Sequence, residues 1–400
     1  MSSIRGIVVS GHLVLNAFAL AIYFAIVWAL GWPGSLDTTV LATMDARSYL
    51  AAGNMLRGIP GDFTAYDPLQ YRPFLFPLLL SLLTGGGMLA FWAFQMAAWI
   101  FAVNATWILL KRMEMPPLLA MGGALLLASH PGLISLSLHG LTEVLTTALV
   151  AAFLLVWQGR ADNSRKLLLM IALAAMLSVV RPVFVLLFLL LLPMVFPMVR
   201  RHGLSFAGLA LLMSLPVLLQ LGMMEARYDA LFISRIGSGT FRNHLLAQVV
   251  MDEEGGTLEQ ARLRTRDMDR PGAARYLAAH PESSLKIYSG NVRDNVWNYS
   301  HAINYPVYHN RLSWLSLRWN QAMALALAAV AALMAFRVAR KQWNKLRAMW
   351  LPAFLSLLVI GSSGISFGEG DRLYMGSLVP NIVLITLSIH AIFISWRTRG

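Results

Sequence analysis

The amino-acid sequence predicts an all-α membrane protein with about ten transmembrane helices. Of its 400 residues, 58% are hydrophobic and 13% are charged, whereas a soluble domain carries about 25% charged residues. The apolar residues are gathered in long runs, and a helix that crosses a bilayer needs about 20 of them. The chain has no cysteine, which excludes disulfides, thiolate metal sites and cysteine nucleophiles.

The first 87 residues are expected to hold one span and one large loop. The apolar run near 12–30 follows a single basic residue, Arg5, and is too long for a signal-peptide core. We predict a retained signal anchor there. The loop 31–87 contains an apolar run of eleven residues at 74–84, which is too short to span. An interfacial helix that ends at the glycines 85–87 is expected in its place.

The apolar run 167–199 is interrupted by Arg181-Pro182. As one straight helix its 33 residues would measure about 50 Å, against a hydrocarbon core of about 30 Å. Two short helices that meet at Arg181-Pro182 are therefore predicted. The other expected spans lie near 88–110, 116–133, 135–157, 204–222, 319–336, 348–366 and 373–396.

The distribution of charge orients these spans. With both termini in the cytoplasm, the cytoplasmic loops hold 15 basic residues against 2 acidic ones, as the positive-inside rule expects. This excess equals the whole formal charge of +13, so the composition gives no support to nucleic-acid binding. We predict a multi-pass membrane protein, surrounded by membrane lipids, with both termini cytoplasmic.

This topology places a second large segment, residues 223–318, on the outer side. It has no apolar run of membrane length. The sequence from Thr257 to Gln260 resembles a helix capping box, and Pro271 and Pro281 are typical of helix starts. A helical periplasmic cap is therefore expected. The predicted division of the chain is an N-terminal transmembrane module at 1–222, this cap segment at 223–318, and C-terminal transmembrane helices at 319–400.

Ionisable residues at or inside apolar helices are costly, and they are candidates for function. Arg72, Arg181 and Arg372 all fall at the outer ends of expected apolar helices. Guanidinium groups bind phosphate through bidentate hydrogen bonds, so a lipid phosphate at the outer leaflet would satisfy all three. Each arginine taken alone could instead extend its side chain to the lipid headgroups.

Two carboxylates, Asp45 and Glu143, complete the candidate set. Asp45 precedes an amphipathic stretch, where it is either a functional group or the cap of a helix. Glu143 is expected about eight residues into the span 135–157, where it is either functional or a structural partner of His139, one turn earlier.

These residues occur in motifs that resemble a known family. The run DARSYLAAGNMLRG at 45–58 and the run YRPFLFPLLL at 71–80 resemble the first outer loop of GT-C glycosyltransferases. The most similar members are the protein O-mannosyltransferase and aminoarabinose transferase group. Further matches are LTE at 141–143, VRP at 180–182 and GDRLY at 370–374. The likeness covers residues 12–222 and 319 to the end.

The resemblance implies a GT-C-like fold and an inverting transfer of sugar from a polyprenyl-phosphate carrier to an acceptor hydroxyl. The acceptor would be a lipid, a glycan or a protein, and the active site would face the periplasm from a bacterial inner membrane. By resemblance, Asp45 is the general base and Glu143 a second catalytic carboxylate, while the three arginines hold the donor phosphate. The residues then expected to contact substrate are Tyr49, Tyr71, His139 and Tyr374.

No cluster of His, Asp and Glu has the spacing of a metal site, so no metal ligands are predicted. By resemblance, the pair Asp45 and Glu143 could still bind a divalent cation.

Two other functions stay open from the sequence. A transporter or flippase for a lipid-linked or anionic substrate would use the arginines to line a path, with a carboxylate as the proton-coupling site. A non-catalytic subunit would use the cap segment to bind a partner. Transporters have broken helices in paired halves and charges near the midplane. Here the charges are biased to one face, which favours chemistry at that surface.

Overall fold

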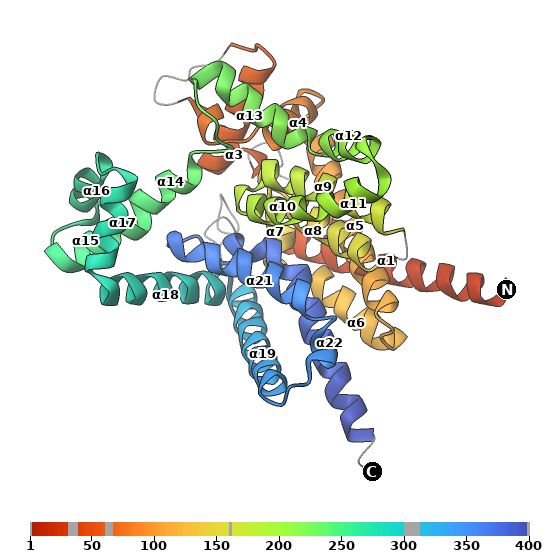
Figure 1. Cartoon of the computed structure of the whole chain (residues 1–400). Coiled ribbons are helices and arrows are strands. Elements are labelled where there is room, and N and C mark those ends of the chain that lie inside the picture. The colour runs from red at the N-terminus through yellow and green to blue at the C-terminus, as the bar shows by residue number, and fades with distance from the viewer. Residues whose placement is uncertain (1, 31–38, 61–66, 160–161, 300–312, 398–400) are drawn as a thin grey trace.

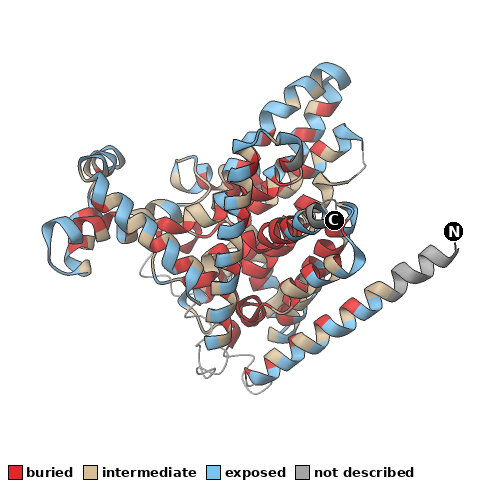
Figure 2. Cartoon of the chain, turned by 90° about the horizontal axis from the view of Figure 1, so that it is seen from below, coloured by how far each residue is buried: buried red, intermediate tan, exposed pale blue. Residues whose placement is uncertain are grey.

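The computed structural model describes residues 2–30, 39–60, 67–159, 162–299 and 313–397, and every regular element in these ranges is a helix. Apolar helices pack into a bundle, and the helices between α14 and α18 project from one side of it (Figure 1). Helix α1 (Ser2–Ala29) lies along an edge of the bundle (Figure 2). The prediction of an all-α protein is confirmed for the described residues.

Six helical segments are long and apolar enough to cross a membrane. They are Gly11–Ala29 in α1, Met88–Arg112 (α5), Asn163–Val180 (α9), Pro182–His202, Ser313–Ala339 (α19) and Gly370–Ile394. A seventh exists if α12 (Leu204–Met213) and α13 (Leu215–Tyr228), which are inclined at 65°, form one broken span. The structure therefore supports a multi-pass membrane protein with six or seven spans by length, rather than the ten expected.

Three of the expected spans are shorter helices. Helix α6 (Pro117–Ala128) ends before His130-Pro131, since Pro131 opens the short helix α7 (Pro131–Leu136). Helix α8 (Glu143–Trp157) begins late because the chain before it packs against another segment, where the Gly140 amide donates to the Val40 carbonyl at 2.8 Å. The third is α21 (Trp350–Ser362).

Two further expected spans are not single regular α-helices. The expected span 204–222 is broken at Ser214, because Pro216 lies in the first turn of α13 and cannot donate to the preceding turn. The last span opens with the 3-10 helix η7 (Gly370–Ser377) and continues as α22 (Leu378–Arg397).

Two other predictions of local secondary structure are confirmed. The run 167–199 is divided at Arg181, which is extended with φ −141°, between α9 and the 3-10 helix η2 (Pro182–Phe184). Beyond η2 the chain continues as α10 (Val185–Leu191), η3 (Leu192–Met194) and α11 (Val195–His202). The short run at 74–84 forms α4 (Leu75–Gly85).

The described part of the cap segment is helical. Its elements are α14 (Ile236–Thr240), a π-helix (Phe241–Leu246), α15 (Ala247–Glu254), α16 (Leu258–Arg266), α17 (Arg270–Ala279) and α18 (Pro281–Trp297). Thr257 and Gln260 form the predicted capping box, and Pro271 and Pro281 lie in the first turns of α17 and α18. A small core of Ala247, Val250 and Ala261 holds α15 and α16 together.

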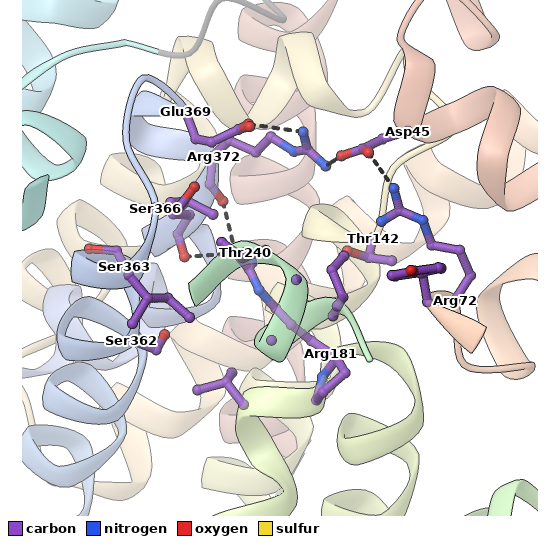
Figure 3. A pocket seen from close by; sticks show the side chains of 18 of the residues that line it. Asp45, Arg72, Thr142, Arg181, Thr240, Ser362, Ser363, Ser366, Glu369 and Arg372 are labelled. Carbon is purple, nitrogen blue, oxygen red and sulfur yellow. Dashed lines mark hydrogen bonds and ion pairs between the residues drawn. The ribbon is translucent and has the colours of Figure 1, made fainter. Parts of the chain in front are cut away.

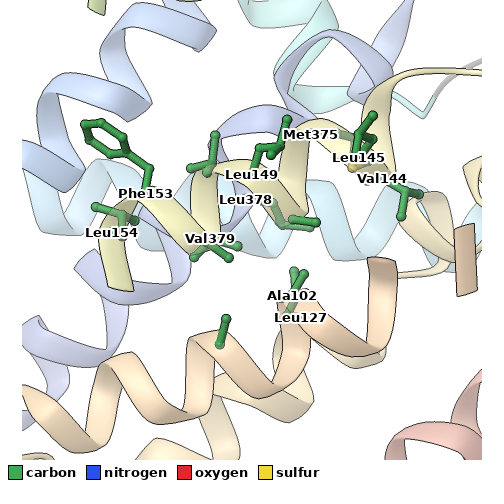
Figure 4. Packing of buried hydrophobic residues seen from close by; sticks show 14 of the residues in the cluster. Ala102, Leu127, Val144, Leu145, Leu149, Phe153, Leu154, Met375, Leu378 and Val379 are labelled. Carbon is green, nitrogen blue, oxygen red and sulfur yellow. The ribbon is translucent and has the colours of Figure 1, made fainter. Parts of the chain in front are cut away.

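The main core lies between α5, α6, α8 and α22 (Figure 4). Leu127, Val144 and Val379 are fully buried there. Buried residues concentrate at the centre of the bundle, while its periphery is exposed (Figure 2). Many exposed side chains on α10 to α13 are large and apolar, including Leu189 and Leu211, as expected of surfaces that face lipid.

Candidate functional site

Six segments that are distant in sequence enclose one cavity of about 590 Å³. Its walls come from α3 (Met44–Leu56), the connection between η1 (Pro68–Gln70) and α4, the start of α8, the junction of α9 with η2, cap helix α14 with the adjoining π-helix, and residues 362–373. The cavity brings together all five charged residues singled out by the sequence, which are Asp45, Arg72, Glu143, Arg181 and Arg372.

Asp45 lies on the first turn of α3, but it does not cap the helix. The N-cap is Thr43, whose side chain accepts a hydrogen bond from the Ala46 amide at 3.1 Å. The carboxylate of Asp45 instead bridges two guanidinium groups, with Oδ1 bound to Arg72 and Oδ2 to Arg372 (Figure 3). The helix-cap interpretation of Asp45 is therefore wrong.

Arg372 is the centre of the charge network. It lies on η7, and each of its three nitrogens meets a different carboxylate. Nε donates to Glu143 Oε1 at 2.8 Å, Nη1 to Glu369 Oε2 at 3.1 Å, and Nη2 to Asp45. The side chain is only 13% exposed, so these contacts carry much of the compensation for its burial.

Glu143 is the first residue of α8, where a negative charge is favourable. It is buried, and its partner is Arg372 rather than His139. The second oxygen, Oε2, has no hydrogen-bond partner among the described residues. A buried carboxylate oxygen without a partner is costly, so this atom is a candidate to receive a hydrogen bond from a ligand.

The other two arginines of the cavity, Arg181 and Arg72, are also held in place by contacts with the protein. Arg181 Nη2 donates to the Leu373 carbonyl at 2.8 Å, while its Nη1 is buried without a hydrogen-bond partner among the described residues. The Arg72 guanidinium lies 4.5 Å from the centre of the Tyr49 ring, and its Nε donates to Ser48 Oγ at 3.1 Å. Both arginines are thus fixed by the protein and keep donor groups at the cavity.

Two of the four expected substrate contacts line the cavity and two do not. Tyr49 and Tyr71 are part of the lining. His139 is buried elsewhere, with Nδ1 3.0 Å from the Thr39 carbonyl, and Tyr374 donates to Asn320 Oδ1 at 2.5 Å behind the cavity. In this arrangement His139 and Tyr374 support the surrounding structure.

Sequence reasoning missed several residues of the lining. Glu369 lies three residues before Arg372, a spacing that could have revealed it, because residues three apart share a helix face. The others give no charge or motif signal. They include Thr240, Asn243, Ser362, Ser363 and Ser366.

The carboxylates that line the cavity are not placed to bind a divalent cation. Both oxygens of Asp45 already meet guanidinium groups, and Glu143 shares Arg372 with it. A cation would have to displace Arg372, which carries the same sign of charge. Across the described residues, no group of three His, Cys, Asp or Glu side chains is arranged to hold a metal ion.

The lining has three arginines and three carboxylates, so its formal charges cancel.

Comparisons with protein-family models, with curated proteins and with solved structures give no match to this chain. The resemblance to GT-C glycosyltransferases therefore stays a prediction from the motifs.

The ion pairs of Asp45 give a testable pH dependence of stability. Burial acts to raise the pKa of Asp45, but the positive charges of Arg372 and Arg72 outweigh it and hold the pKa well below the ordinary 3.8. Such a carboxylate stabilises the fold above its unfolded pKa, and this stabilisation is lost as pH falls through the folded pKa.

We therefore expect the difference in thermal stability between the wild type and Asp45→Asn to be constant from about pH 7 to about pH 5 and to shrink below about pH 4. Thermal unfolding of the detergent-solubilised protein across this range measures it. A difference that instead grows as the pH falls would contradict the lowered pKa.

Proposed function

We propose that this chain is an inverting membrane glycosyltransferase. It would move a sugar from a polyprenyl-phosphate carrier to the hydroxyl of a lipid, glycan or protein at the periplasmic face of a bacterial inner membrane. The observation that carries the proposal is the convergence of three arginines and two predicted catalytic carboxylates on one cavity among apolar helices.

The arginines suit the phosphate of the donor. The leaving group is a lipid monophosphate, which gains negative charge as the glycosidic bond breaks. Arg181 Nη1 is an unpaired buried donor at the cavity, and Arg72 and Arg372 carry further N–H groups there. Bidentate N–H groups on phosphate oxygens would stabilise this developing charge.

Asp45 would be the general base. The acceptor oxygen attacks the anomeric carbon and passes its proton to Asp45, while the bond from that carbon to the phosphate oxygen breaks and the electron pair leaves with the phosphate. In the ligand-free site Asp45 is a weak base because Arg372 and Arg72 stabilise its charged form. A phosphate that takes over these guanidinium groups would restore its basicity, so donor binding would precede proton transfer.

A transporter is the second candidate, and one observation bears on it. The bent pair α12–α13 is a discontinuous helix, a feature of transporters. However, the break is at Ser214, which carries no charge and does not line the cavity. The ionisable groups and the break between α12 and α13 are therefore separate. This favours a catalysed reaction in the cavity over transport through it.

The decisive experiment uses vesicles that contain the purified protein and polyprenyl-phosphate carriers with labelled sugars. We expect label to move to an acceptor with release of polyprenyl phosphate. Arg181→Gln should reduce transfer by about tenfold or more, because a charged hydrogen bond to the phosphate is lost.

Arg227→Ala is the matched control for Arg181→Gln. It breaks an ion pair with Asp67 that lies outside the cavity lining, so transfer should be unchanged. Movement of the intact sugar-lipid across the vesicle membrane, without cleavage, would support the transporter instead.

A further inference from the structure

One wall of the cavity is built by the cap segment and carries no charge that faces the arginines. Ile236, Gly237, Thr240, Asn243 and His244 contribute to this wall. Their spacing is helical, since residues three and four apart share one face. Helix α14 and the π-helix that follows it therefore present a single face to the cavity. Isolated π-helical turns often occur at functional sites.

This helix is fastened to the charged side of the cavity. The Arg235 amide donates to the Gln70 carbonyl at 2.8 Å, and Arg235 Nη1 donates to Gln70 Oε1 at 2.8 Å. Ser234 Oγ donates to the Tyr71 carbonyl at 2.6 Å. Tyr71 immediately precedes Arg72, so the position of the cap wall is coupled to that of a candidate phosphate ligand.

The polar groups of the cap wall have unused hydrogen-bonding capacity. Within the described ranges, the Asn243 side-chain amide and the Thr240 hydroxyl form no hydrogen bond. His244 uses only Nδ1, which lies 3.3 Å from Ser366 Oγ, and this leaves Nε2 available. Burial and the nearby charge of Arg262 lower the pKa of His244, which favours the neutral ring, and a neutral imidazole can both donate and accept.

The facing wall is a turn that carries three hydroxyl groups. Ser362, Ser363 and Ser366 lie on the side of the cavity away from Asp45 and Arg72 (Figure 3). Cap helix α18 holds this turn, because Asn295 Nδ2 donates to the Ser363 and Ser366 carbonyls at 3.0 and 2.8 Å. The Ser362 and Ser363 hydroxyl groups donate to backbone carbonyls of α21 at 2.7 Å each, so they can only accept from a ligand.

The cavity therefore has two ends that differ in chemical character. One end offers charged groups that suit a phosphate, and the other offers neutral hydroxyl, amide and imidazole groups from two elements. Small neutral groups that both donate and accept match the hydroxyl groups of a sugar, whereas an acyl chain would leave them unpaired. A volume of about 590 Å³ lies within the range of small-molecule sites.

We propose that Thr240, Asn243 and His244, with Ser366 adjacent to His244, form the subsite that binds the sugar of the donor. The inference rests on the proposed function and adds to it the part of the chain that recognises the sugar. The cap segment would then select the donor, while the residues from the apolar helices hold its phosphate.

The test compares three lipids: polyprenyl phosphate without sugar, polyprenyl-phosphate hexose and polyprenyl-phosphate aminopentose. Binding to the purified full-length protein is measured for each. The wild type should bind at least one sugar-bearing lipid more tightly than the bare lipid. Asn243→Ala combined with His244→Ala should weaken that binding by roughly tenfold and leave the bare lipid unaffected, because two hydrogen bonds to the sugar are lost.

Two further variants guard against an effect on folding. Asn243→Ala alone removes an exposed side chain without a partner in the described structure, so it should fold normally and still weaken the sugar-bearing lipid. His280→Ala is the control, since His280 lies on the cap segment, pairs with Glu253 and does not line the cavity.

A second pair of variants tests whether the sugar occupies the space beside the cap wall, independently of its hydrogen bonds. A side chain at Gly237 would meet no atom within 4 Å of its Cβ, so Gly237→Leu would fill the cavity. It should exclude the sugar-bearing lipid more than the bare one. Gly290→Leu is matched to it, because Gly290 is equally open but lies on α18 outside the lining.

The outcomes separate the two proposals. If no sugar-bearing lipid is preferred, or if the double variant binds them as the wild type does, the sugar subsite is overturned. If the bare lipid is not bound, or if its binding ignores Arg181→Gln, the proposed function fails as well.

Discussion

Asp45→Asn is expected to lower the rate of sugar transfer by about 10²–10⁴-fold, the usual contribution of a general base. The asparagine keeps the size of the side chain and one oxygen for a guanidinium group, but it cannot take the proton of the acceptor. Arg72 and Arg372 would lose a competing carboxylate, so the donor should bind as tightly as before or more tightly. The expected signature is a fall in kcat without a rise in KM for the donor.

Asp67→Asn is the control for this prediction. Asp67 is another carboxylate in the loop 31–87, where it accepts from Tyr228 Oη at 2.6 Å and does not line the cavity. Its replacement should leave transfer unchanged. If a folded Asp45→Asn protein transferred sugar at the wild-type rate, Asp45 would not be the base.

Arg372→Gln should affect both stability and transfer. It leaves Asp45, Glu143 and Glu369 without their shared partner, and breaking a buried ion pair costs about 3–5 kcal/mol of folding free energy. Because Asp45 and Glu369 are about a third exposed, water screens them and the lower end of this range is expected. Transfer should fall by about 10²–10³-fold, as for the loss of one preorganised charge donor.

Thermal unfolding in detergent and the transfer assay measure these two effects. Arg264→Gln is the matched control, because it breaks a 2.5 Å pair with Glu254 that is about half exposed and screened by water, so the unfolding temperature and the transfer should hardly change. Arg372→Lys keeps the charge, but one ammonium group cannot reproduce the fork that meets three carboxylates. An Arg372→Gln protein with unchanged unfolding temperature and transfer would refute the central role of Arg372.

Local chemistry was sufficient for much of the secondary structure. Arg181-Pro182 divides the run 167–199 because proline cannot continue a helix, and Thr257 with Gln260 forms a capping box from side chains three residues apart. Such features depend on neighbours in sequence. The late start of α8 was not predictable in this way, because it follows from contacts between Gly140 and Val40, which are 100 residues apart.

The charged half of the site was predicted more completely than its neutral half. Asp45, Arg72, Glu143, Arg181 and Arg372 stand out in an apolar sequence because burial of a charge demands a partner. Hydroxyl and amide groups cost less to bury and occur everywhere, so Asn243 and the serines at 362–366 gave no comparable signal.

The sequence by itself determined that this is an all-helical membrane protein, and which charges need a partner. Both follow from composition and periodicity, since apolar runs and isolated charges have the same cost wherever the chain folds. Only the tertiary structure decided which partners meet. Arg372 binds Asp45 from 327 residues away, and the cap segment closes the cavity opposite them. Such contacts arise from the packing of distant helices, which no local pattern encodes.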